Sequence, residues 1–125
     1  MNDQRFPKRL RLRKQEDFDR VYGSKAYAAD DVLVMNGCPN GSDRLRLGLS
    51  ISRKVGTAVV RNRWKRLIRE AFRKRRGELP PGFDFVVRPR RGAEPHFASI
   101  ADSLPKLARR IARRNEEGRS EGSRT

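Results

Sequence analysis

The sequence has only one cysteine and one histidine among its 125 residues. Cys38 has no partner for a disulfide within the chain, and it lies in a turn-rich stretch rather than in a zinc-binding pattern. His96 is the single histidine, so the chain offers neither a histidine pair nor a Cys–His cluster for a metal. These absences exclude an internally disulfide-bonded fold and a structural zinc site, and they fit a reducing compartment.

Long apolar runs are also absent. The longest contain four residues, such as "VLVM" at 32–35. The N-terminal "MNDQRFPKRL" lacks the apolar core of a signal peptide. We therefore expect a soluble, cytoplasmic protein with no membrane partner and no membrane span.

Acidic residues are scarce relative to basic ones. Thirty-one Lys and Arg stand against 15 Asp and Glu, which gives a formal net charge of +16 and a pI near 11.5. A folded chain with this charge repels itself until it meets a polyanion, so nucleic acid is an expected partner. The length and the 35% hydrophobic content predict one compact domain over residues 1–125.

Strand signals alternate with helix signals along the chain. Period-two alternation is clearest in "RLRLGLSIS", where leucine and isoleucine occupy every second position. The predicted strands are "DVLVMN" at 31–36, "RLRLGLSIS" at 44–52 and "FDFVV" at 83–87, with loops at "GCPNGSDR" and "RPRRGAEP". Pro89 cannot donate to a ladder, so we expect the last strand to end there.

Three helices are predicted. The first lies in "KQEDFDRVYG", and the second is capped by Thr57 and runs to about Arg76. The third follows the helical spacing of Ile100, Leu104, Leu107 and Ile111, although Pro105 must kink it or delay its start. We expect a flexible basic arm at 1–8 and a disordered tail at 115–125.

The stretch "RNRWKRLIREAFR" at 61–73 combines a core face with a cationic face. On a helical wheel its apolar side chains share one arc, and its basic side chains lie opposite. Residues 61–76 hold nine basic residues and one acid, Glu70, for a net charge of +8. A merely solvated helix would carry acidic partners at i+4, whereas an arginine-rich face suits phosphate. We expect Trp64 to fill the core and Glu70 to orient Arg66 or Arg73.

Several motifs in the right order resemble one known family. "GLSISRKVGTAVVRNRWKRLIREAFR" closely resembles the signature of the bacterial ribonuclease P protein component. "RLRKQEDFDRVY" is similar to the first helix of that family, and "LPPGFDFVVRPR" is similar to its last strand. The resemblance covers roughly residues 9–92.

The resemblance implies an α+β fold, a single-domain α/β sandwich with a mixed sheet and packed helices. A left-handed crossover would lead into the Arg-Asn-Arg helix, as in the second domain of ribosomal protein S5. The implied function is that of the protein subunit of a ribonucleoprotein endonuclease that removes the 5′ leader from precursor tRNA. The RNA subunit would carry the chemistry and require Mg²⁺, and the protein alone would bind no cofactor and no small-molecule substrate.

The resemblance also implies two sets of site residues. Contact with the catalytic RNA would come from Arg53, Lys54, Arg61, Asn62, Arg63, Lys65, Arg66 and Arg69. A cleft between the first helix and the sheet would hold the single-stranded leader, with Phe18 and Tyr22 at its aromatic positions and Met35 at a third. Aromatic rings stack on bases without demanding a sequence. From the residues alone, core packing under the first helix is the favoured role of Phe18 and Tyr22.

No catalytic side chain is expected. The adjacent acids Glu16 and Asp17 suit a helix N-terminus, and Asp30 and Asp31 suit a solvated strand edge. Two other classes of protein stay open. One is a structural RNA-binding protein such as a ribosomal protein. The other is a DNA-binding module, although the sequence lacks a helix at helix-turn-helix spacing before "RNRWKRLIREAFR". The basic residues of "KLARRIARR" could extend the RNA footprint or stay solvated; they are Lys106, Arg109, Arg110, Arg113 and Arg114.

Overall fold

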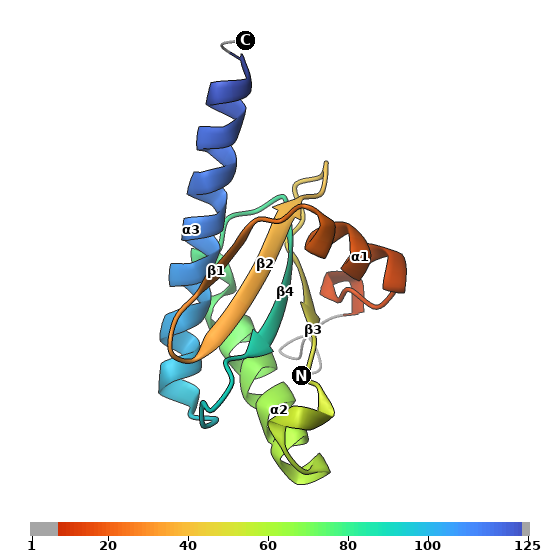
Figure 1. Ribbon diagram of the computed structural model, residues 1–125, viewed down its shortest axis with the longest axis vertical. Helices are drawn as coiled ribbons and strands as arrows, with labels where there is room; N and C mark the ends of the chain where they lie inside the picture. Colours follow the sequence, from red (N-terminus) through yellow and green to blue (C-terminus); the bar gives the residue numbers. More distant parts are fainter. Residues whose placement is uncertain (1–7, 124–125) are drawn as a thin grey trace.

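The fold is built on one four-stranded mixed sheet (Figure 1). The structure is a computed structural model that describes residues 8–123, with side chains to residue 116. The strand order is β1-β2-β4-β3, formed by β1 (Tyr27–Ala29), β2 (Leu33–Pro39), β4 (Phe83–Pro89) and β3 (Arg46–Leu49). β1 and β4 pair antiparallel with β2, whereas β3 and β4 are parallel. The predicted α+β class with a mixed sheet is confirmed.

Helices cover both faces of this sheet (Figure 1). α2 (Ala58–Arg75) and α3 (Phe97–Ser123) pack on one face, and α1 (Gln15–Gly23) lies over the other. Short 3₁₀ turns stand at η2 (Lys8–Leu10), η3 (Arg53–Val55) and η4 (Arg76–Glu78). α2 lies in the connection from β3 to its parallel neighbour β4, the crossover for which the family resemblance implies a left hand.

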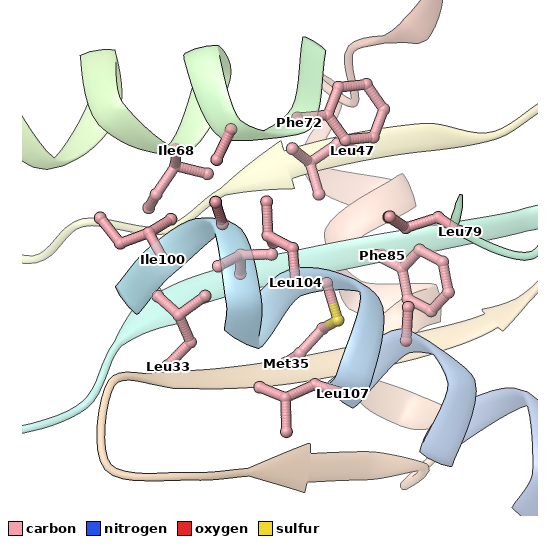
Figure 2. Close-up of a cluster of buried hydrophobic side chains, with 14 of the residues drawn as sticks. Leu33, Met35, Leu47, Ile68, Phe72, Leu79, Phe85, Ile100, Leu104 and Leu107 are labelled. Atoms are coloured by element: carbon pink, nitrogen blue, oxygen red, sulfur yellow. The ribbon is translucent and has the colours of Figure 1, made fainter. Parts of the chain in front are cut away.

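The main core lies between the sheet and the pair α2 and α3 (Figure 2). Leu33 and Met35 of β2 and Phe85 of β4 point into it, where they meet Ile68 and Leu104 from the helices. Strand side chains alternate between faces, so Cys38 and Val86 point the other way. They form a smaller cluster under α1 with Leu12 and Val21.

The long helix α2 forms as the sequence predicts. The Val60 N–H donates to Oγ1 of Thr57 at 3.3 Å, which confirms the predicted N-cap. Trp64 is fully buried, as expected of a core residue, although its indole Nε1 has no hydrogen-bond partner among the described residues. Ile68, Ala71 and Phe72 are buried with it, so the apolar arc of the wheel is the packed face.

Two strands differ from the prediction. β1 was not predicted, because three residues are too few to show an alternating pattern. β2 continues through Gly37 and Cys38 to Pro39, where the sequence predicts a loop. Gly37 is a site of close approach rather than a turn, since a Cβ there would lie 2.5 Å from Cδ1 of Phe85. β3 is shorter than predicted, and β4 ends at Pro89 as predicted.

The C-terminal helix is longer than the sequence predicts. α3 starts at Phe97 and runs through Pro105, so the helix does not start late. It also continues over residues 115–123, where a disordered tail was predicted. Once a helix is nucleated, each added residue gains one backbone hydrogen bond for one residue fixed. Of the predicted arm, Lys8 lies in η2, while residues 1–7, like 124–125 of the tail, lie outside the described residues.

Candidate nucleic-acid interface

The predicted basic residues lie along the solvent side of η3 and α2. Asn62, Arg63, Arg66 and Arg69 are exposed, and Arg61 and Lys65 are half-buried. Arg53 and Lys54 are exposed on η3, which contacts α2. The eight predicted positions therefore lie on two adjoining elements, η3 and α2, and we call this set of residues the α2 face.

A glycine positions η3 against α2. Gly56 has φ +153°, and a Cβ at this residue would lie 3.1 Å from the Val60 side chain. A side chain is therefore disfavoured here, and the chain passes directly from η3 to the Thr57 cap. This turn holds Arg53 and Lys54 beside the first turn of α2.

The cations of the α2 face lack acidic partners. Seven are present: Arg53, Lys54, Arg61, Arg63, Lys65, Arg66 and Arg69. None of them forms an ion pair with any residue that the structure describes, and Nε of Arg61 is buried without a hydrogen bond. The cations at the C-terminal end of α2 differ, because Arg73 and Lys74 contact Glu70 and Arg75 contacts Glu78. The predicted role of Glu70 is confirmed for Arg73.

Two further arginines lie next to η3. A cavity of about 580 Å³ is lined by Lys54 and Val55 on one side and by Arg90 and Arg91, just after β4, on the other. Both arginines are exposed. Sequence reasoning assigned them only to a loop, although two consecutive arginines directly after a strand were a usable signal. They extend the basic surface from α2 toward the start of α3.

The aromatic residues of α1 lie between that helix and the sheet. Phe18 and Tyr22 are half-buried and pack against the smaller cluster. A Cβ on Gly48 of β3 would lie 2.8 Å from Cζ of Phe18, so the ring lies directly on the strand backbone. The guanidinium carbon of Arg88 is 5.9 Å from the centroid of the Tyr22 ring, a cation–π arrangement.

Met35 does not lie with these rings, and its assignment to the leader cleft is wrong. Its side chain has no exposed area and belongs to the main core on the opposite face of the sheet. Because strand residues alternate, a shift of one residue moves a side chain to the other face. Asn36 faces the α1 side, opposite Val86 of β4. Its Oδ1 is buried and has no hydrogen-bond partner among the described residues.

A buried carboxylate fixes α1 over this face of the sheet. Asp84 of β4 has no exposed area and accepts hydrogen bonds from Arg46, Asn40 and Arg20. Burial would raise the pKa of the Asp84 carboxyl, but hydrogen bonds from Arg46, Asn40 and Arg20 outweigh it, so the pKa is lowered. Arg20 belongs to α1, and therefore this network sets the distance between the helix and the strands.

Asp17 and Asp30, one from each pair of adjacent acids, also have structural partners. Asp17 lies 3.3 Å from Arg20, and Asp30 accepts the N–H groups of Val32 and Leu33 at 2.9 Å each. Within the described part of the chain, no group of three or more His, Cys, Asp or Glu could hold a metal ion. No helix in that part is long and apolar enough to cross a membrane.

Most basic residues of α3 contact the protein itself. Lys106 lies 3.1 Å from Asp30, and Arg109 lies 3.5 Å from Glu78. Arg110 and Arg114 donate to the backbone carbonyls of Ala29 and Tyr27 in β1. Among these five, Arg113 alone has no contact of this kind with a described residue. These contacts favour a structural role over an extension of the RNA footprint.

The fold is that of an α+β protein, and the α2 face gives it an exposed basic surface. Comparison with known proteins agrees: the model of the family "Ribonuclease P" matches residues 6–112. A ribonuclease P protein component of Caldanaerobacter subterraneus is 38% identical over 113 residues, covering 90% of this chain and 97% of its own. The same component of Shouchella clausii is 40% identical over 105 residues, covering 82% and 86%.

Solved structures give the same result. The Staphylococcus aureus RNase P protein matches with a TM-score of 0.70 and 35% identity, over 82% of this chain and 94% of that one. The RNase P protein of Thermotoga maritima matches with a TM-score of 0.71 and 34% identity, over 80% and 96%. The chain belongs to the ribonuclease P protein family.

Proposed function

We propose that this chain binds the catalytic RNA of ribonuclease P through the α2 face. The observation that carries the proposal is the set of seven cations without acidic partners, next to ion-paired cations on the same helix. Each phosphate that such a face neutralises releases condensed counterions, which favours binding to a folded RNA. Arginine predominates in this set, and its planar guanidinium forms paired hydrogen bonds with phosphate.

The second part of the proposal is that the space between α1 and the sheet holds the 5′ leader of precursor tRNA. Phe18 and Tyr22 are half-exposed there, and the bases of a single strand are free to stack on such rings. Asn36 supplies a buried acceptor on the same face, which suits the edge of a base. Together the two surfaces hold the catalytic RNA and its substrate on one small protein.

In this proposal the protein subunit promotes 5′ maturation of tRNA, and the RNA subunit performs the cleavage with Mg²⁺. The acidic side chains described above are engaged in ion pairs and turn hydrogen bonds, so the protein's contribution is binding and positioning. The site of action would be the cytoplasm, where precursor tRNA is made in a bacterial cell.

Reconstitution tests the function. The purified chain, treated to remove RNA, should not cleave precursor tRNA. Addition of a bacterial ribonuclease P RNA should give correct 5′ processing at a lower Mg²⁺ concentration than the RNA needs alone. Site-specific cleavage by the RNA-free chain would contradict the assignment of chemistry to the RNA. Purification of the chain with ribosomal RNA in place of one long structured RNA would favour the structural RNA-binding class.

A further inference from the structure

A second basic feature lies where the N-terminal segment meets α2. The Leu12 N–H donates to the Leu47 carbonyl at 3.0 Å, and Arg11 forms a parallel bridge with Leu47. Residues 11–13 therefore run along the free edge of β3. Leu12 points into the smaller cluster under α1, so Arg11 and Arg13 on either side of it are directed away from that cluster.

Two residues of α2 face these arginines across a pocket. Lys65 and Arg69 stand one helical turn apart and line it together with Arg11 and Arg13, while Leu47 and Leu49 of β3 form an apolar floor. The pocket has a volume of about 230 Å³. This is enough for a phosphate group with part of its ribose, and the apolar floor suits the sugar.

The charged side chains that line the pocket in residues 8–123 are all basic. In the described part of the chain no acidic side chain lines it. The pKa of Arg11 is lowered, first by burial and then by the positive charges of Arg69 and Arg13. Cations from both walls therefore already repel one another in the free protein. An anion bound between the two walls would offset this repulsion.

We propose that this pocket is a seat for a single RNA phosphate, held between Arg11 and Arg13 of the N-terminal segment and Lys65 and Arg69 of α2. Its position joins the two surfaces, because Leu12 and Phe18 belong to the same cluster under α1. That the ligand is RNA rests on the proposed function. The pocket and its basic lining are observed in the structure and do not depend on that function.

The first test uses the full chain and inorganic phosphate, without RNA. Binding would be followed by NMR of the arginine Nε–H groups, after circular dichroism has shown each variant to be folded. Arg13→Gln and Arg69→Gln should each weaken phosphate binding about tenfold, the loss expected for one charge-assisted hydrogen bond. The double variant should weaken phosphate binding by clearly less than the product of the two single effects, since either change alone opens the seat.

Arg113→Gln is the matched control, because it removes the same charge from an exposed residue of α3. It should change phosphate binding by less than about twofold, as expected for a screened surface charge. If Arg13→Gln and Arg69→Gln resemble this control, or if their effects simply multiply, the four residues form no common seat and the proposal is overturned.

Binding experiments with RNA show whether the phosphate belongs to the catalytic RNA or to the leader of precursor tRNA. If it belongs to the catalytic RNA, Arg13→Gln should weaken binding of that RNA in the absence of tRNA. If it belongs to the leader, the assembled holoenzyme should lose affinity for precursor tRNA only once the leader is long enough to reach the pocket. If neither affinity changes while phosphate binding is lost, the seat is not used by RNA and the proposal is overturned. Failure of the wild-type chain to bind the catalytic RNA would instead refute the proposed function.

Discussion

Asp84 and Arg46 form a two-pronged ion pair between neighbouring strands under α1. Nε of Arg46 lies 2.9 Å from Oδ1 of Asp84, and Nη2 lies 2.7 Å from Oδ2. The same carboxylate accepts a hydrogen bond from Arg20 of α1. One buried acid therefore neutralises two arginines and ties the helix to the sheet at a fixed height above Gly48.

We expect Asp84→Asn to destabilise the protein by about 1 to 3 kcal/mol, because the guanidinium groups of Arg20 and Arg46 lose their buried counter-charge and keep only the more exposed Asp17. Urea unfolding measures this change. Asp43→Asn removes the same charge from an exposed loop residue and should cost less than about 0.5 kcal/mol. Equal midpoints for the two variants would show that the network does not hold α1.

Stability should also fall in acid through Asp30. Its pKa is lowered to about 2 from an ordinary value of 3.8: burial opposes the shift, and hydrogen bonds from Ser103, Leu33, Val32 and Lys106 outweigh it. The ionised form is thus favoured by folding. Its contribution is complete above about pH 4 and is lost as the pH falls toward 2.

The free energy of unfolding, measured between pH 5 and pH 2, should therefore fall less with decreasing pH for Asp30→Asn than for the wild type. Asp31→Asn changes the exposed neighbour and serves as the control, with a pH dependence close to that of the wild type. The same acid slope in all three proteins would show that Asp30 does not couple folding to protons.

The aromatic surface under α1 is tested by a change that keeps a large apolar side chain but removes the ring. Phe18→Leu should retain most of the packing on Gly48 and cost less than about 1.5 kcal/mol of stability. The folded holoenzyme should nevertheless lose much of its preference for precursor over mature tRNA, since base stacking contributes about 1 to 3 kcal/mol per base. Parallel titrations of the two tRNAs measure this preference.

Met35→Leu is the matched control on the other face of the sheet. It should leave the preference for precursor tRNA unchanged, because Met35 is enclosed in the main core. A loss of discrimination with Met35→Leu, or full discrimination with Phe18→Leu, would place the leader elsewhere.

Two arginines of α3 protect the edge of the sheet. The Ala26 carbonyl accepts from Gly37, and the Asp30 N–H donates to Leu33, so even-numbered residues of this segment face β2. The carbonyls of Tyr27 and Ala29 must then point outward, and these are the groups bound by Arg114 and Arg110. An open edge strand offers such groups to a second chain.

We therefore expect the double variant Arg110→Ala and Arg114→Ala to self-associate at concentrations where the wild type is monomeric. Sedimentation velocity would detect the association. Arg113→Ala removes a neighbouring charge that has no such contact and should sediment like the wild type. Unchanged sedimentation of the double variant would show that the arginines are not needed to close this edge.

The sequence predicted those parts of the molecule in which local pattern and function coincide. The wheel of α2 separates Trp64 and Ile68 from the basic side because one helix serves both core and surface. The face on which Met35 lies could not be predicted, since it depends on a strand register that pairing with β4 decides. Arg11 and Arg13 join Lys65 and Arg69 only through the bridge to Leu47, a long-range pairing without a local signal.

The unpaired cations of α2 are expected to bind the catalytic RNA. The most direct measurement is the dependence of RNA affinity on salt for two double variants of this one helix. Arg66→Ala with Arg69→Ala should weaken binding and reduce the log–log salt slope by about 0.7 to 0.9 for each phosphate that the variant no longer neutralises. Lys74→Ala with Arg75→Ala removes the same charge from ion-paired positions and should leave the slope nearly unchanged. Equal slopes for the two variants would contradict the account, because RNA would then sense only the net charge of the helix.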